Sequence, residues 1–212
     1  MATADLVLYT HPRSRGRIAR WMLEEVGCPY RVELLGYGDT MKSDAFLALN
    51  PMGKVPTLVH RGAVVTEAAA ICAYLAEAFP DAGLGPEDTP QARAAYLRWL
   101  FFAAGPLEAA VTAKSLGLLA PAERAQMVGY GSFEQAIDTL ERAVAGAAPW
   151  ITGARFTAAD VYVGAQVIWG LQFKTLPQRD AFAAYAARLT ARDAYRRAAA
   201  ADDALIPPAP QA

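Results

Sequence analysis

The stretch from Asn50 to Ile71 combines groups that could bind a small peptide. Val55 precedes Pro56, and a proline at the beginning of a strand removes one ladder N–H and leaves the neighbouring backbone without its partner. Thr66 and Glu67 then open a helix whose first-turn N–H groups are unpaired and attract anions. A loop backbone and an anion-binding helix start therefore lie a few residues apart, which suits a small peptide that carries carboxylates.

This stretch resembles the glutathione-binding half of the glutathione S-transferases. The family signature is a Val-Pro pair before a strand, a short hairpin, and then an acidic residue and a serine that open a helix. Here the pair is Val55-Pro56, and the helix opens at Glu67-Ala68. The resemblance also covers the beginning of the chain and, more weakly, the helical remainder. It implies an α/β thioredoxin-like first domain followed by an all-α domain, in a cytosolic transferase of bacterial, serine-class-like type.

The resemblance also implies which residues bind glutathione. Val55 corresponds to the residue whose backbone pairs with the cysteinyl part of the tripeptide, across a cis bond to the following proline. Lys54, and alternatively Lys42, faces the glycyl carboxylate, and Glu67 lies near the γ-glutamyl amine. Ala68 departs from the pattern, because the family usually has serine there. A lost hydrogen bond to a charged group costs about 1.5–3 kcal/mol, so we expect weaker glutathione binding than in a typical relative.

The same resemblance places the chemistry in the loop after the first strand. These enzymes stabilise the glutathione thiolate, and a hydroxyl donor beside the sulfur favours the charged form. We predict Ser14 as this donor, because it follows Tyr9 by five residues and directly precedes a helix whose N–H groups would also face the sulfur. Tyr9 is the alternative, and Ser14 would otherwise be an ordinary helix N-cap. Arg15 is a further candidate, since its permanent charge would favour a thiolate. The simpler interpretation of its basic cluster is a solvated helix face formed by Arg13, Arg15, Arg17 and Arg20.

Hydrophobic periodicity and breaker residues divide the chain into two domains. Within residues 1–80, the pattern predicts strands at 6–9, 30–34, 57–60 and 63–65. It predicts helices at 14–26, 43–49 and 67–79. Residues 81–89 hold the densest cluster of Gly, Pro and Asp and predict a linker. Residues 90–212 predict an all-helical domain, with helices at 91–116 (interrupted at Gly105-Pro106), 122–146, 157–173, 178–189 and near Asp193.

The second substrate is expected to bind against the helical domain. The resemblance implies an apolar electrophile pocket, for which we predict Pro12, Trp99, Phe102 and Ala103, with Trp169 and Phe173 as alternatives. Aromatic residues at helical spacing are more often core than pocket. Thr157 and Asp160 fit a capping box, which gives Asp160 a role in folding and not in catalysis.

Composition weighs against several other classes of function. A hydrophobic content of 54%, a charged content of 19% and a net charge of −1 indicate a folded protein with no electrostatic attraction to nucleic acid or a membrane surface. Cys28 and Cys72 form no CxxC and have no metal-ligand spacing, which is typical of two buried, reduced thiols in a cytoplasmic protein. His11 and His60 lack acidic partners at triad or metal spacing, and His60 is expected to be exposed. We therefore expect glutathione as co-substrate and no metal.

We predict a cytoplasmic, homodimeric glutathione S-transferase that conjugates the glutathione thiolate to a small hydrophobic electrophile, in the manner of detoxification enzymes. The dimer is implied by the resemblance alone. A glutathione-dependent isomerase or peroxidase is one alternative, and a non-catalytic binding or scaffold protein on the same fold is another. Ser14, Val55-Pro56 and Glu67 favour an enzyme, whereas Ala68 slightly favours the scaffold.

Overall fold

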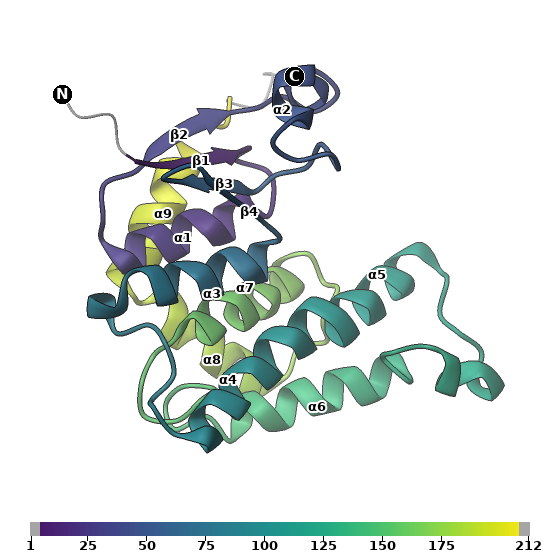
Figure 1. Ribbon diagram of the computed structural model, residues 1–212. Helices are drawn as coiled ribbons and strands as arrows, with labels where there is room; N and C mark the ends of the chain where they lie inside the picture. Colours follow the sequence, from purple (N-terminus) through teal and green to yellow (C-terminus); the bar gives the residue numbers. More distant parts are fainter. Residues whose placement is uncertain (1–4, 208–212) are drawn as a thin grey trace. The chain divides into compact units, whose positions relative to one another are not determined.

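The computed structural model describes residues 5–207, which form two compact units (Figure 1). Residues 5–83 and 192–207 make up the first unit, and residues 84–191 make up the second. The predicted domain boundaries, 1–80 and 90–212 with a linker at 81–89, stay a prediction. The structure differs from them in one respect, because residues 192–207 pack with the first unit.

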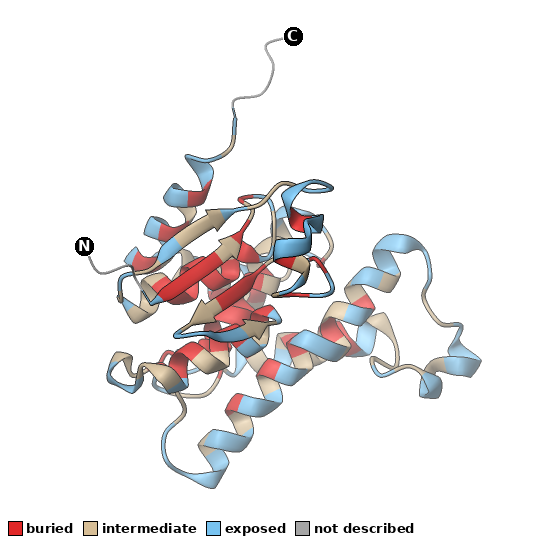
Figure 2. Ribbon diagram, turned by 45° about the horizontal axis from the view of Figure 1, so that its top comes forward, coloured by how far each residue is buried: buried red, intermediate tan, exposed pale blue. Residues whose placement is uncertain are grey.

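A four-stranded sheet forms the centre of the first unit. Its strands are β1 (Leu6–Thr10), β2 (Arg31–Leu34), β3 (Thr57–His60) and β4 (Ala63–Thr66), in the order β2-β1-β3-β4. β1 and β2 are parallel, whereas β3 is antiparallel to both β1 and β4. Leu8 of β1 pairs with Leu58 of β3, and both side chains are fully buried. Figure 2 shows burial concentrated on these two central strands, as their apolar runs predict.

Helices on the sheet complete the first unit. The crossover between the parallel strands is α1 (Gly16–Val26), which buries Ile18, Trp21 and Met22 at helical spacing and ends at Gly27 with φ 74°. Figure 1 shows α1 and α3 together below the sheet and α2 above one end of it. The remaining helical segments are η1 (Thr40–Lys42), α2 (Asp44–Leu47), α3 (Ala68–Ala78), η2 (Pro80–Ala82) and α9 (Asp193–Asp203).

The last helix, α9, packs against α1. Arg20 of α1 donates to Asp202 at 2.8 Å, and both side chains are buried. The Trp21 and Tyr195 rings meet edge to face with centroids 5.0 Å apart. These contacts join residues about 180 positions apart in the sequence, so helical periodicity alone does not assign α9 to the first unit.

The second unit is all-helical in its described residues. Its segments are α4 (Pro90–Phe102), η3 (Ala103–Leu107), α5 (Glu108–Leu116), η4 (Ala122–Met127), α6 (Phe133–Ala145), α7 (Ala158–Gln172) and α8 (Asp180–Thr190). The predicted interruption at Gly105-Pro106 is a single π-helical turn, through which the chain continues into α5. Between residues 5 and 207, no helix is long and apolar enough to cross a bilayer.

The prediction of one helix over 122–146 is wrong. Residues 122–127 form only a 3-10 turn, and α6 begins after Ser132. Gly131 has a φ of 64°, which a continuous α-helix does not allow. Ser132 and Gln135 form a reciprocal capping box with both hydrogen bonds at 3.1 Å, so this local pattern defines a separate helix start.

The predicted capping box at the start of α7 is confirmed. The fully buried Asp160 accepts from the Thr157 N–H at 2.9 Å and from its hydroxyl at 3.1 Å. The same carboxylate also accepts from the Ile151 N–H at 2.8 Å and the Tyr185 hydroxyl at 2.7 Å. Asp160 therefore stabilises the core of the second unit, beyond the helix start that the sequence predicts.

Candidate functional site

The pairing of the strands brings the predicted site residues of the first unit to one end of the sheet. Tyr9 at the end of β1 pairs with Thr57 at the beginning of β3, and Thr57 pairs with Thr66 at the end of β4. The three segments that join the sheet at this row are residues 11–15 after β1, residues 50–56 before β3, and the start of α3 after β4. The sequence prediction distributes the thiol donor, the peptide-binding backbone and the anion-binding helix start over these same three segments.

Ser14 lies at the start of α1, within a tight turn. Its N–H donates to the His11 carbonyl at 3.1 Å, and its Oγ donates to the same carbonyl at 2.7 Å. The Gly16 N–H in turn donates to Ser14 Oγ at 2.9 Å. A hydroxyl that accepts a hydrogen bond is a better donor, so this contact prepares Ser14 to donate to an anion.

The N–H groups at the start of α1 are used within the protein, which differs from the expectation that they face the sulfur. The Gly16 N–H binds Ser14 Oγ, and the Arg17 N–H binds the Ser14 carbonyl at 3.2 Å. The Ile18 N–H binds the Arg15 carbonyl at 3.0 Å. Of these three groups, only the Gly16 N–H contacts the Ser14 hydroxyl.

Tyr9 lies on the face of the sheet opposite to α1. Side chains alternate along a strand, and the neighbouring Thr10 side chain is the one that meets Gly16 of α1. The Tyr9 ring instead packs against Phe46 of α2, with centroids 5.7 Å apart. This placement favours Ser14 over Tyr9 as a group that acts together with the start of α1.

The other residues of the loop after β1 hold its shape. The Arg13 N–H donates to His11 Nδ1 at 3.1 Å, so this nitrogen must be unprotonated. Burial, assisted by the charge of Arg13, lowers the pKa of His11 and favours this neutral form. Tyr37 packs against the His11 ring at 4.5 Å and donates to the Arg13 carbonyl at 3.1 Å.

Asn50 organises the segment before β3. Its buried side-chain amide donates to the Lys54 carbonyl at 2.9 Å and to Thr57 Oγ1 at 3.1 Å. Its Oδ1 accepts from the Met52 N–H at 3.1 Å. The sequence marks Asn50 only as the beginning of the 50–71 stretch, because no local pattern indicates that its side chain reaches Thr57, seven positions later.

Val55 presents free backbone groups at this turn. The Val55–Pro56 bond is cis, as the family resemblance implies. In the described part of the chain, neither the N–H nor the C=O of Val55 has a backbone partner. A short peptide in extended conformation could therefore pair with both groups, as an added strand does.

Lys42 and Lys54 lie beside this turn and differ in their hydrogen bonds. Lys42 Nζ donates to the Gly53 carbonyl at 2.9 Å and to the Met52 carbonyl at 3.2 Å. An ammonium has three N–H donors, so one remains for a ligand. Lys54 is exposed, and its carbonyl, but not its side chain, is bound by Asn50.

The start of α3 offers unpaired N–H groups. The first α3 hydrogen bond in the described structure runs from the Ile71 N–H to the Glu67 carbonyl at 2.9 Å, and the N–H groups of residues 68–70 have no backbone acceptor there. Glu67 is exposed and has a φ of 66°, a conformation that non-glycine residues adopt rarely. Such local strain is common at ligand-binding sites. At residue 68 an anion would meet a backbone N–H, because alanine has no hydroxyl.

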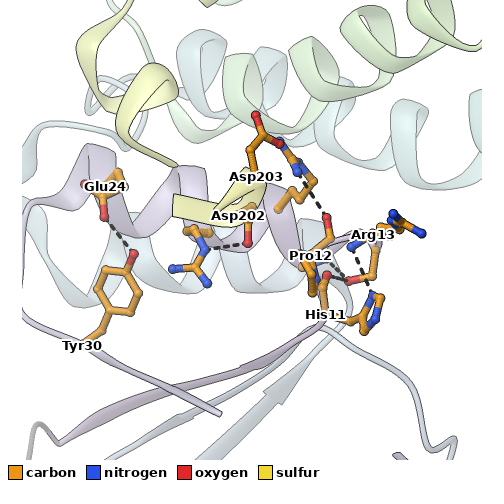
Figure 3. A network of polar contacts seen from close by, with 11 residues as sticks. His11, Pro12, Arg13, Glu24, Tyr30, Asp202 and Asp203 are labelled. Carbon is orange, nitrogen blue, oxygen red and sulfur yellow. Dashed lines mark hydrogen bonds and ion pairs between the residues drawn. The ribbon is translucent and has the colours of Figure 1, made fainter. Parts of the chain in front are cut away.

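The basic cluster on α1 is not simply a solvated face. Figure 3 shows Asp202 and Asp203 of α9 above the loop that carries His11, Pro12 and Arg13. Arg17 donates to Asp203 at 2.8 Å, and Arg20 donates to Asp202 at the same distance. The simpler interpretation of the cluster is therefore wrong for these two arginines, whereas Arg13 and Arg15 are exposed.

The remaining polar candidates have structural surroundings. His60 is half-buried, in contrast to its expected exposure, because Nδ1 lies 2.9 Å from the Tyr74 hydroxyl and its ring stacks on Phe79. Cys72 is buried as predicted, and Cys28 is half-buried; burial raises the pKa of both thiols. Within residues 5–207, no group of three or more His, Cys, Asp or Glu side chains could hold a metal ion.

The residues predicted for the electrophile pocket differ in exposure. Trp99 and Phe102 are half-buried on α4 and meet edge to face, with centroids 5.7 Å apart. Ala103 is fully buried and presents no surface to a ligand. Pro12 is buried in the first unit, where its carbonyl accepts from Arg17. Trp99 and Phe102 are thus the accessible members of the predicted set. Of the two alternatives, Trp169 is half-buried and Phe173 is exposed.

Comparison with known proteins agrees with this arrangement. The family described as glutathione S-transferase, N-terminal domain, matches residues 14–78. Glutathione S-transferase GST-4.5 of Xanthomonas campestris pv. campestris is 37% identical over 95 residues, which span only 46% of that protein and 45% of this chain. Glutathione S-transferase GstA of Escherichia coli O157:H7 is 30% identical over 165 residues, which cover 79% of that protein and 75% of this chain.

A solved structure extends the similarity over nearly the whole chain. The theta class glutathione S-transferase from Xanthomonas axonopodis pv. citri, with glutathione bound, superposes with a TM-score of 0.73 at 28% identity and covers 93% of this chain and 98% of that one. The predicted fold class and the predicted enzyme class, glutathione transferase, are thereby confirmed. This chain belongs to the glutathione S-transferase family.

Proposed function

We propose that this chain binds glutathione at the end of the sheet marked by Tyr9, Thr57 and Thr66, and that it transfers the glutathione thiolate to a small apolar electrophile. The observation that carries the proposal is the unpaired Val55 backbone, which lies in the same row as the Ser14 loop and the start of α3. A thiolate donor, a free backbone and an anion-binding helix start thus lie at one end of the sheet, and each has a counterpart in the tripeptide.

Binding begins with the backbone of the cysteinyl residue. Its N–H and C=O pair with the free C=O and N–H of Val55, in the manner of a short antiparallel strand. The γ-glutamyl carboxylate then meets the unpaired N–H groups at the start of α3, and Glu67 accepts from the γ-glutamyl amine. The glycyl carboxylate lies near Lys42, which has one donor left, with exposed Lys54 as the alternative.

The chemistry depends on the single proton of the Ser14 hydroxyl. In the unliganded protein this proton is directed to the His11 carbonyl. When the thiol binds and loses its proton to solvent, the hydroxyl turns to donate to the sulfur, while the Gly16 N–H continues to donate to Ser14 Oγ. The thiolate then forms a C–S bond with the electrophile, and the electron pair leaves with the displaced group or moves onto an activated acceptor.

Several finer features belong to the proposal only. Trp99 and Phe102 are the candidates for apolar contact with the electrophile, and Arg15 for electrostatic support of the thiolate. The serine-type subclass, the homodimer, the cytoplasmic location and the role in detoxification follow from family resemblance.

The proposal predicts that glutathione binding and activity respond to different substitutions. Calorimetric titration should show glutathione binding to both wild type and Ser14→Ala, because Val55 and α3 hold the tripeptide. Turnover of a panel of electrophiles should be lower in Ser14→Ala than in wild type. A panel that also contains peroxides and maleyl compounds distinguishes conjugation from peroxidase and isomerase activity. Absence of glutathione binding in wild type would refute the proposal and favour a scaffold role.

A further inference from the structure

The geometry points to Arg17 as a positioning residue that connects α9 to the loop carrying Ser14. The inference rests on the proposed function, because it concerns how the Ser14 hydroxyl is held for the thiolate. Arg17 is on α1, it does not take part in the proposed binding of glutathione, and its position in the sequence indicated only a basic helix face.

Arg17 holds the Ser14 turn from both sides. Its guanidinium Nη1 donates to the Pro12 carbonyl at 3.2 Å, and its main-chain N–H donates to the Ser14 carbonyl at 3.2 Å. Pro12 and Ser14 are the residues on either side of Arg13, so one residue fixes both ends of this tripeptide segment. The position of Ser14 Oγ depends on the same turn, since that oxygen bonds back to His11 at 2.7 Å.

Asp203 of α9 holds the guanidinium in place. Arg17 Nη2 donates to Asp203 Oδ1 at 2.8 Å, while the other terminal nitrogen reaches Pro12 (Figure 3). The planar fork of arginine lets two nitrogens bind two different acceptors in a fixed geometry, which a lysine ammonium does not reproduce. The Arg17 side chain is 24% exposed and Asp203 is 64% exposed. The ion pair by itself therefore contributes little to stability, and its geometry is the feature to explain.

A neighbouring contact between the same two helices provides a matched control. Arg197 of α9 donates to the Glu24 carboxylate at 2.9 Å and to the Glu24 carbonyl at 3.1 Å. Glu24 lies toward the other end of α1, where it accepts from Tyr30 and not from the Ser14 loop (Figure 3). Loss of Arg197 removes another partly exposed α1–α9 ion pair, which has no contact with the Pro12–Ser14 segment.

The test is the ultraviolet thiolate band of bound glutathione, recorded across pH for wild type, Arg17→Ala, Arg17→Lys, Asp203→Asn and Arg197→Ala. Positioning predicts that both Arg17 variants raise the pKa of the bound thiol by about 0.5–1 unit, which is about a 3- to 10-fold loss of thiolate below that pKa. Asp203→Asn should raise it by less, and Arg197→Ala should leave it unchanged.

Two results would overturn the inference. If Arg17 acts only through its charge, Arg17→Lys should match wild type, and Asp203→Asn should lower the thiol pKa because a neutralising carboxylate is gone. If Arg17 only stabilises the fold, Arg17→Ala and Arg197→Ala should behave alike.

A readout without glutathione separates this inference from the proposed function. Amide hydrogen exchange of residues 11–16 in the unliganded protein should be faster in Arg17→Ala than in wild type and Arg197→Ala. Equal exchange in the three proteins would refute the positioning role, even if wild type forms no thiolate band. A missing band with faster exchange would refute the thiolate chemistry alone.

Discussion

Gly16 is the residue whose substitution tests most sharply how the start of α1 positions Ser14. A Cβ atom added to Gly16 would lie 2.9 Å from the Thr10 Cβ and 2.9 Å from Ser14 Oγ, and closer still to Thr10 Oγ1. Ordinary contacts begin near 3.4 Å, so the neighbours must separate by at least 0.5 Å. Gly16 does not have a positive φ, and alanine is therefore excluded by space and not by backbone conformation.

The expected effect of Gly16→Ala on stability is moderate, whereas its effect on activity is large. Overpacking costs about 1–3 kcal/mol, and alanine recovers at most about 1 kcal/mol through its helix propensity. Thr10 belongs to the central strand β1, so the start of the helix and Ser14 are the parts that move. Because a misplacement of about 1 Å can cost about 100-fold in rate, we expect kcat/KM to fall about 10- to 100-fold.

Steady-state conjugation assays and denaturant unfolding of Gly16→Ala and Gly164→Ala would measure both effects. Gly164 lies on α7, where an added Cβ would meet the end of the Leu189 side chain, so this control overpacks the second unit and not the Ser14 turn. We expect Gly164→Ala to lose stability with little change in kcat/KM. Wild-type activity in Gly16→Ala would refute the view that this close packing holds Ser14 in place.

Four further substitutions test other parts of the account. Asp160→Ala leaves four donors without this acceptor and should cost about 3–5 kcal/mol in urea unfolding; a loss below 1 kcal/mol would contradict the buried network. Asn50→Ala should weaken glutathione binding about 10-fold by calorimetry, because the Val55 turn loses the hydrogen bonds that shape it; unchanged affinity would show that the turn forms without them. Ala68→Ser should tighten glutathione binding at least about 10-fold by restoring a hydroxyl to the carboxylate site, and no gain would exclude this explanation of weak binding. Burial and Glu24 raise the pKa of Tyr30 to about 12, so the neutral Tyr30 hydroxyl stabilises the fold fully below pH 10, and this contribution is lost as the pH rises toward 12. The melting temperature of wild type should therefore fall more steeply over this pH range than that of Tyr30→Phe. Parallel curves for the two proteins would contradict the raised pKa.

Local sequence patterns predicted most of the first unit. The apolar runs at β1 and β3, the alternation at β2, and the Arg61-Gly62 turn each carry their own signal within a few residues, and each strand is found where expected. The stop at Gly27 follows from a left-handed φ that glycine accepts readily. The cis Val55–Pro56 bond and the roles of the three site segments were expected from the family resemblance and not from local patterns.

Contacts between distant residues were beyond these patterns. The association of α9 with α1 depends on ion pairs between residues far apart in the chain, and the sequence of α9 alone reads as one more polar helix. The role of Asn50 depends on hydrogen bonds to the Lys54 carbonyl and to Thr57 of β3, which the local pattern does not indicate. The start of α6 is marked by the capping-box spacing of Ser132 and Gln135 and by the positive φ of Gly131, whereas the prediction of one helix over 122–146 includes neither feature.

The ultraviolet thiolate band of bound glutathione, measured across pH in wild type and Ser14→Ala, tests the central claim most directly. We predict a band near neutral pH in wild type, and its loss near neutrality in Ser14→Ala with glutathione still bound, because the Ser14 hydroxyl is the donor that the Gly16 N–H prepares. A band of equal pKa in the variant would contradict the role of Ser14. No band in wild type at saturating glutathione would contradict thiolate stabilisation altogether.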